Sequence, residues 1–177
     1  MEENKSRENY FQGKYRIGSA RLSEWDYRKK ACYFVTICTH QMIPAFGIIL
    51  NGKMELNNLG LFANDSIEGI KNYKKHVKVF NHVVMPNHVH LLIYLSNNTG
   101  NKKINAFGPL IKDSLSSLLN HFKGRITKHA KNTSLFWPGW HERFHDHIIR
   151  NEVSYKKINQ YISENPLNWR SDRYFRQ

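Results

Sequence analysis

Two apolar segments joined by Pro86-Asn87 place the strongest constraint on how this chain can fold. The segments VKVFNHVVM (77–85) and HVHLLIYL (88–95) are rich in the β-branched and aromatic residues typical of strands. Pro-Asn is a turn pair, and two strands joined by so tight a turn must run antiparallel. The sequence therefore predicts an antiparallel strand pair at 77–95.

The rest of the chain alternates between strand and helix patterns. Asn51-Gly52 lies between two apolar segments, which is a strong signal for a β-hairpin. Asn151 is suited to cap a helix and Pro166 to stop it. Further strands are predicted at 31–40 and 143–150, and helices at 57–73, 108–131 and 151–165. An antiparallel sheet with helices packed on it is an α+β fold.

The 177 residues favour a single folded domain with a core of ordinary size. Residues 1–30 are polar and basic without an apolar period, so we expect a basic N-terminal arm there and one domain at 31–177. No apolar run approaches the roughly 20 residues of a membrane helix. Cys32 and Cys38 are the only cysteines, which points to a reduced, cytoplasmic location.

Positive charge is in large excess and is unevenly spread. Lys and Arg number 27 against 14 Asp and Glu, a net charge of +13. Acids are absent from 69–112, which holds seven lysines, and from 114–140, which holds Lys123, Arg125, Lys128 and Lys131. Such stretches are the electrostatic signature of a protein that binds nucleic acid. A solvated basic surface that maintains solubility would give the same charges.

Two histidines, one residue apart, interrupt the second strand of the pair. Side chains alternate across a strand, so His88 and His90 share one face, with Cα atoms about 6.6 Å apart. The alternate residues form an apolar row on the other face. Imidazoles at this spacing can share a divalent ion, and two ligands leave positions open for a phosphate oxygen. The chain has ten histidines, so the pattern also arises by chance, as at His145–His147.

A metal beside a basic surface indicates phosphodiester chemistry, which needs a nucleophile. Tyr161 lies at the border of the apolar stripe of the last predicted helix, and Asn165 follows one turn later on the same edge. A phenol there could attack a phosphate, and the amide could reach a metal beside it. Tyr161 could equally pack at the edge of the sheet without a chemical role.

Several segments, taken in order, resemble the REP-associated tyrosine transposases, which belong to the single-tyrosine HUH transposases of insertion sequences. The resemblance extends over about residues 15–169. The segments are YRIGSARLSEWDY (15–27), YFVTICTH (33–40), NHVVMPNHVHLLI (81–93), WHERFHDHIIRNE (140–152) and INQYISENP (158–166).

The resemblance implies a ferredoxin-like or RRM-like fold, which agrees with the order of elements above. It implies that 31–177 is an HUH catalytic domain in which His88 and His90 bind Mg²⁺ or Mn²⁺ and Tyr161 is the nucleophile. The protein is then a single-stranded DNA endonuclease and strand-transferase that forms a 5′-phosphotyrosine intermediate at hairpin-associated sites. Related enzymes carry a glutamine where this chain has Asn165, so Asn165 is the candidate third metal ligand. His147 is a candidate to support the ligands from a neighbouring strand.

DNA contacts can be expected only by residue class. Arg150, before the tyrosine helix, and Arg16 and Arg21 in the arm are expected at phosphates, and Trp137 is expected to stack on a base. We expect single-stranded or hairpin DNA as the partner, no membrane contact and a nucleoid-associated, cytoplasmic location. The protein is expected to be a monomer or a homodimer, with Tyr161 serving its own chain or its partner.

Two other functions stay open at this point. An RRM-like sheet could bind hairpin DNA or RNA without catalysis, although binding alone needs none of His88, His90 and Tyr161. A zinc-dependent hydrolase could use the histidines, but no HExxH-type or carboxylate-rich ligand set accompanies them.

Overall fold

A four-stranded antiparallel sheet with helices on both faces forms the body of the protein. The computed structural model describes residues 10–11, 15–16, 25, 27, 29–96 and 113–176. The strands of this sheet follow the order β6-β7-β3-β8. Their bounds are Val77–Met85 for β6, His88–Leu95 for β7, Ala31–Cys38 for β3 and His145–Ile149 for β8. This arrangement confirms the predicted α+β fold.

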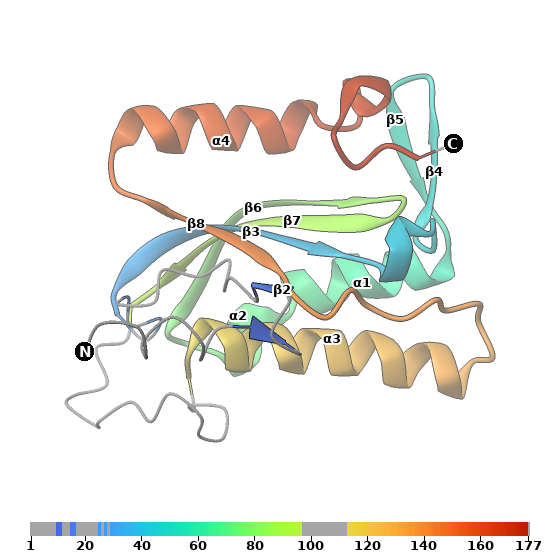
Figure 1. The fold of residues 1–177 in the computed structure, drawn as a ribbon, viewed down its shortest axis with the longest axis horizontal. Coiled ribbons are helices and arrows are strands. Elements are labelled where there is room, and N and C mark those ends of the chain that lie inside the picture. The colour runs from blue at the N-terminus through green and yellow to red at the C-terminus, as the bar shows by residue number, and fades with distance from the viewer. Residues whose placement is uncertain are drawn as a thin grey trace.

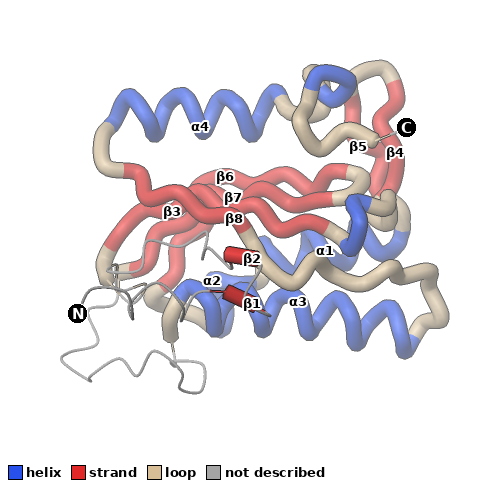
Figure 2. The backbone as a smooth tube through the Cα atoms, viewed as in Figure 1, coloured by secondary structure: helices blue, strands red, loops and turns tan. Residues whose placement is uncertain are grey.

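The helices form two layers, one on each side of the sheet (Figure 1 and Figure 2). On one side lie α1 (Asn58–Glu68), the short α2 (Ile70–Tyr73) and α3 (Leu115–Asn132). On the other side lies α4 (Glu152–Glu164) alone, followed by the C-terminal segment. Within the described ranges, no helix is both long enough and apolar enough to span a bilayer.

The predicted strand pair is present as β6 and β7, with Met85 opposite His88 beside the Pro86-Asn87 turn. One row of β7 side chains faces α1 and α3 and is fully buried: Val89, Leu91, Ile93 and Leu95. The central strand β3 adds Tyr33, Val35 and Ile37 to this core, and α3 adds Leu119, Phe122 and Ile126. The opposite row of β7 lies beneath α4, so the alternation read from the sequence decides which residues face the site.

The predicted hairpin at Asn51-Gly52 joins β4 (Gly47–Leu50) to β5 (Lys53–Leu56) in a separate two-stranded sheet. Asn51 has φ 49° and Gly52 has φ 74°. Positive φ at both central residues is the requirement of the tight turn that matches the twist of paired strands, and Asn-Gly meets it at least cost.

The long helix α3 begins at Leu115, later than the predicted start at Gly108. Residues 108–112 lie outside the described residues. Ser114 is extended, with φ −80° and ψ 162°, and its side chain accepts a hydrogen bond from the Ser117 amide. The helix therefore starts at a serine cap, a signal that the apolar period alone did not locate.

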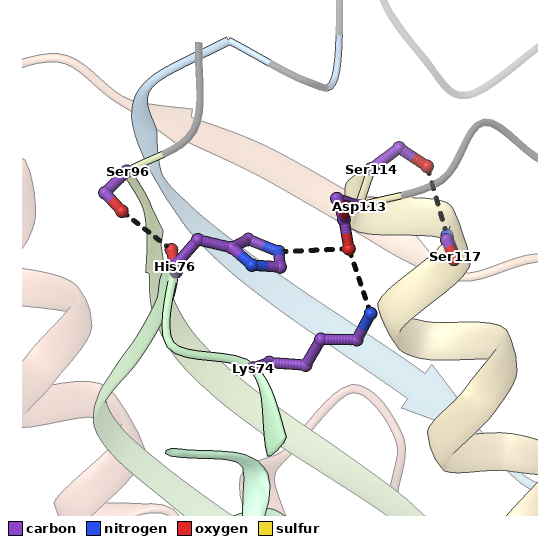
Figure 3. Close-up of polar contacts among 6 residues, drawn as sticks. All are labelled: Lys74, His76, Ser96, Asp113, Ser114 and Ser117. Carbon is purple, nitrogen blue, oxygen red and sulfur yellow. Dashed lines mark hydrogen bonds and ion pairs between the residues drawn. The ribbon is translucent and has the colours of Figure 1, made fainter. Parts of the chain in front are cut away.

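The residue before this cap belongs to a small polar cluster at the end of the sheet (Figure 3). Asp113 Oδ1 lies 3.0 Å from Lys74 Nζ and 3.8 Å from His76 Nε2. Ser96 Oγ donates a 3.1 Å hydrogen bond to the His76 carbonyl. These contacts tie the end of β7, the start of β6 and the start of α3 to one another.

Parts of the predicted arm are also described. β1 (Tyr10–Phe11) and β2 (Tyr15–Arg16) pair antiparallel. Trp25 and Tyr27 pack against the core, and Trp25 Nε1 donates a 3.1 Å hydrogen bond to the Tyr33 hydroxyl. The division of the chain at residue 31 stays a prediction.

Capping of α4 leads to a stability prediction. The Asn151 side chain accepts a 2.8 Å hydrogen bond from the Ser154 amide, as the sequence predicts. Replacing Asn151 with Ala should lower the free energy of unfolding by about 1 kcal/mol in urea titrations, because a helix-end N–H loses its partner. Asn151→Asp should retain most of the stability, and Asn120→Ala on the exposed face of α3 should cost nothing. Equal stability of Asn151→Ala and the parent protein would contradict the capping role.

Candidate metal and tyrosine site

His88 and His90 point from β7 toward α4 and approach each other closely. Their Nε2 atoms are 3.0 Å apart, and the two side chains are 0% and 1% exposed. The Nδ1 atom of His88 lies 2.9 Å from Asn87 Oδ1, and that of His90 lies 2.8 Å from Thr36 Oγ1. Both rings are therefore fixed through their Nδ1 atoms, and their Nε2 atoms point into a common space.

The amide of Asn87 determines how the His88 ring is protonated. Asn87 is fully buried, and its Nδ2 donates 2.9 Å hydrogen bonds to the carbonyls of Met42 and Tyr174. Its oxygen can then only accept, so the neutral His88 ring carries its proton on Nδ1. The Nε2 atom of His88 is left with a lone pair, which is the form that binds a metal.

The pocket fits a divalent cation. Two ligands at right angles, each about 2.1 Å from an ion, lie about 3.0 Å apart, which is the spacing of the two Nε2 atoms. A carboxylate oxygen of Asp172 and these nitrogens all lie within 4.8 Å of one another. The Asn165 Oδ1 atom is buried and has no hydrogen-bond partner among the residues that the structure describes. Two imidazoles with carboxylate and amide oxygens form a mixed set that suits a divalent metal ion, and this set does not identify which one.

Asp172 is the member of the cluster that sequence reasoning missed. It follows the short 3₁₀ helix η2 (Trp169–Ser171), and it is the only acid after Glu164 in a basic C-terminal segment. Its isolation among arginines was the one available signal. No periodic pattern connects it to the histidines, which are more than 80 residues earlier in the chain.

Asn165, the predicted third ligand, lies in the cluster. It is 1% exposed and donates a 2.8 Å hydrogen bond from Nδ2 to Asp172 Oδ2. Its backbone is helical, with φ −56° and ψ −43°, although the residue before a proline usually avoids this region. The hydrogen bond to Asp172 offsets that preference and keeps the amide in the site. Whether Asn165 binds a metal stays a prediction.

The phenol of Tyr161 lies beside the histidines and Asp172 of the same chain. Its hydroxyl lies 3.3 Å from His90 Nε2 and donates a 2.9 Å hydrogen bond to Asp172 Oδ2. The ring contacts His90 and meets Phe34 edge to face, with 39% of the side chain exposed. Burial first, and then the hydrogen bond to the Asp172 carboxylate, raises the pKa of the phenol. Tyr161 is therefore a neutral phenol with a proton acceptor in contact.

The C-terminal segment covers the histidine pair. Tyr174 lies 4.7 Å from His88 and 5.8 Å from His90 between ring centroids, and Trp169 lies 5.9 Å from His88. Burial lowers the pKa of His88 to about 4, and the nearby Asp172 carboxylate and Asn165 amide oppose this only in part. Burial holds the pKa of His90 well below its usual value. The charges of His88 and Arg173 lower this pKa further, each by less than burial does. Both rings are neutral at pH 7, as metal ligands must be.

The other predicted residues lie outside this cluster. His147 is exposed on the same sheet face but two strands from β7, paired with Phe34. Arg150 is exposed and lines a hollow of about 290 Å³ at the start of α4. Trp137 packs against the core residue Phe46, on the face of the sheet opposite Tyr161. The side chain of Arg16 and the whole of Arg21 lie outside the described residues.

Burial of neutral His88 predicts a pH-dependent stability of the metal-free protein. Its pKa is about 4 in the folded chain and near 6.5 in the unfolded chain, so unfolding takes up a proton between these values. Stability should therefore fall as the pH is lowered from 6.5 to 4. His88→Gln should remove about 3 kcal/mol of this loss when unfolding is measured in EDTA at pH 7 and pH 4. A parent and a variant with parallel pH profiles would contradict the neutral, buried state.

Comparison with known proteins finds one relative in sequence and others in fold. No known protein-family profile matches the chain. An uncharacterized protein of Haemophilus influenzae is 32% identical over 174 residues, which cover 94% of this chain and 97% of that protein. A structure of a REP-associated tyrosine transposase bound to a REP hairpin superposes with a TM-score of 0.55 and 23% identity, covering 84% of this chain and 74% of that one. A candidate transposase of Deinococcus radiodurans gives a TM-score of 0.42 and 16% identity over 81% of this chain and 95% of that one.

The superposition agrees with the fold that the sequence resemblance implied, and the two histidines on β7 form with Asp172 a group that could hold a metal ion. The chain belongs to the same family as the Haemophilus influenzae protein and has the fold of the REP-associated tyrosine transposase.

Proposed function

We propose that this protein is a metal-dependent single-stranded DNA endonuclease and strand-transferase that acts through a phosphotyrosine intermediate. One observation carries the proposal. The Tyr161 hydroxyl contacts both the His90 Nε2 atom and the Asp172 carboxylate of its own chain. Neither nucleic-acid binding nor simple packing requires a phenol, two neutral imidazoles and a carboxylate at one point.

In the proposed reaction the Tyr161 oxygen attacks a phosphorus atom of the DNA backbone. A bond forms between the phenolic oxygen and phosphorus, and the bond from phosphorus to the 3′ oxygen of the preceding nucleotide breaks. The products are a 5′-phosphotyrosine link and a free 3′ hydroxyl. Because the energy of the diester is kept in the tyrosyl ester, the 3′ hydroxyl of the same or another strand can reverse the step without a nucleoside triphosphate.

Asp172 is positioned to accept the proton of the Tyr161 hydroxyl in this step. Its Oδ2 atom already accepts the hydrogen bond of the Tyr161 hydroxyl, and its Oδ1 atom accepts a 2.7 Å hydrogen bond from the Tyr174 amide. The raised pKa of the phenol means that attack must be coupled to proton loss. The carboxylate takes that proton as the phenolic oxygen bonds to phosphorus, and the departing 3′ oxygen takes up a proton from water to become the 3′ hydroxyl.

The donors that would hold a metal are His88, His90 and Asp172, with Asn165 as a fourth candidate. Mg²⁺ or Mn²⁺ bound there would polarise the scissile phosphate and stabilise charge on its oxygens. The chain's own residues orient this site, because Asn87 and Thr36 direct the two Nε2 atoms inward. Tyr161 reaches the histidines of its own chain, which favours cleavage within one protomer.

The substrate class follows from charge and from the structural relative. The net charge of +13 favours a polyanion, and the superposed transposase is bound to a hairpin of REP DNA. We therefore assign single-stranded DNA beside a hairpin as the substrate, in the cytoplasm at the nucleoid. Arg150, Arg16 and Arg21 are the proposed phosphate contacts, and Trp137 is a proposed base contact.

A covalent adduct tests the nucleophile. The protein is incubated with Mn²⁺ and an end-labelled single-stranded hairpin from its own genomic neighbourhood, and the products are separated under denaturing conditions. The parent protein should form an adduct that resists denaturation, and Tyr161→Phe should lose it while binding the hairpin with unchanged affinity. Tyr155→Phe is the matched control, because this tyrosine lies on the same helix and packs on Phe80, away from the histidines.

Two outcomes would contradict this proposal. Adduct formation by Tyr161→Phe would place the nucleophile elsewhere. Tight hairpin binding by the parent protein without any adduct on all hairpins tested would instead support an inactive binding module.

Metal affinity tests the ligand set separately from DNA. Mn²⁺ titrated by calorimetry should bind the parent protein, and Asp172→Asn should weaken binding by about 10- to 100-fold because a charged oxygen ligand is lost. Asn165→Ala should weaken it by less. Asp65→Asn, on the exposed face of α1, serves as the control for a lost carboxylate. Unchanged Mn²⁺ affinity in Asp172→Asn would remove Asp172 from the ligand set.

A further inference from the structure

A basic site lies on α3, on the side of the sheet opposite α4 (Figure 1). A hollow of about 420 Å³ opens there between α3 and the segment that leads into β8. Its lining includes Lys123, Gly124, Thr127, Lys128, Lys131 and Trp140. Because α4 and the histidines lie across the sheet, this hollow is separate from the site described above.

Positive charge surrounds the hollow. Lys128 and Lys131 are exposed, and among the described residues neither has an acidic partner. Lys123 is held in place by hydrogen bonds of 2.9 Å and 3.4 Å to the carbonyls of His141 and Glu142. Residues 114–140 contain no acid, and Asp113 and Glu142 are the acids that flank this stretch. Three lysines around one small hollow favour a phosphate group.

An aromatic ring lines the same hollow. Trp140 is half-buried and fixed, because its Nε1 donates a 3.0 Å hydrogen bond to the Lys123 carbonyl and its ring meets Trp137 edge to face at 4.9 Å. A rigid indole beside ammonium groups is the combination by which proteins hold an unpaired base and its phosphate. The Thr127 hydroxyl at the rim accepts from Trp137 Nε1 and can still donate to a ligand.

Gly124 keeps the hollow open. It lies in the middle of α3, where glycine costs about 0.5–1 kcal/mol relative to alanine. A Cβ atom built on Gly124 would meet nothing within 4 Å, and its φ is not positive. Neither close packing nor backbone geometry therefore requires a glycine, whereas any larger side chain would project into the hollow.

We propose that this hollow binds one unpaired nucleotide of single-stranded DNA, with the base on Trp140 and the phosphate on Lys128 and Lys131. The volume is that of a small-ligand site and exceeds what one nucleotide needs. The site contributes affinity and position, and it takes no part in cleavage. It goes beyond the proposed function, because it requires neither the metal nor Tyr161.

Photocrosslinking locates the base. The full-length protein is mixed with an oligothymidylate of eight nucleotides that carries one 5-iododeoxyuridine, in EDTA, and irradiated. Trypsin should release the peptide 132–143 with a crosslink at Trp140. Gly124→Leu should lose this crosslink, because its side chain occupies the hollow, and Tyr161→Phe should keep it. A parent protein with no crosslink in 132–143 would overturn the proposal, whatever the result of the covalent adduct assay.

Binding measurements separate the hollow from general attraction. By fluorescence anisotropy with labelled oligothymidylate, Gly124→Leu should weaken binding about tenfold at unchanged salt dependence. Gly124→Ala should retain most of the affinity, and both variants should keep the parent circular dichroism spectrum. The double variant Lys128→Ala with Lys131→Ala should reduce the slope of log affinity against log salt by about 0.7, because one phosphate contact is lost.

The control is a charge-matched pair of exposed lysines, Lys53→Ala with Lys75→Ala, away from α3. This pair should leave the affinity and the salt slope near the parent values. Equal losses in the two lysine pairs would show that only net charge matters, and full affinity in Gly124→Leu would show that the hollow is not used. Either result would overturn the proposal.

Discussion

The hydrogen bonds that hold the two Nδ1 atoms are the interaction on which the site depends. Asn87 and Thr36 fix the His88 and His90 rings from behind, so that both Nε2 atoms face one point at a separation of 3.0 Å. Burial keeps both rings neutral, which preserves their lone pairs but costs stability when they are protonated. Without these two supports, the rings could rotate and the ligand pair would be lost.

The other polar groups of the site, a phenol, an amide and a carboxylate, lie on one continuous segment. Asn151 caps the start of α4, and this helix carries Tyr161. The chain then turns through Asn165 to Asp172. Trp169 and Tyr174 anchor this segment in a small cluster with Cys38 and Met85. Because a phenol, an amide and a carboxylate arrive on one anchored segment, their spacing is set by local packing. This explains how a single chain can assemble the whole arrangement.

The sheet divides the molecule into two chemically different faces. On the α4 side, polar and aromatic groups converge on His90, whereas on the other side the apolar core is covered by α1 and by the basic helix α3. The strand alternation of β7 produces this division, since each residue that enters the core sends its neighbour to the site. The α4 side therefore presents a polar and aromatic site, whereas the other side presents a basic helix over the apolar core.

The sequence by itself determined the strand pair at 77–95, the Asn51-Gly52 hairpin, the capped tyrosine helix and the shared face of His88 and His90. These are local properties, governed by alternation, turn chemistry and helix caps, so neighbouring residues suffice to predict them. The start of α3 depended on Ser114, whose capping role the apolar period did not reveal. Tertiary structure alone decided that Asp172 joins the histidines, that Trp137 lies on the face away from Tyr161, and that Gly124 opens a hollow beside Trp140. Those contacts join residues far apart in the chain, and packing of the C-terminal segment and of α3 against the sheet sets them, which no local pattern encodes.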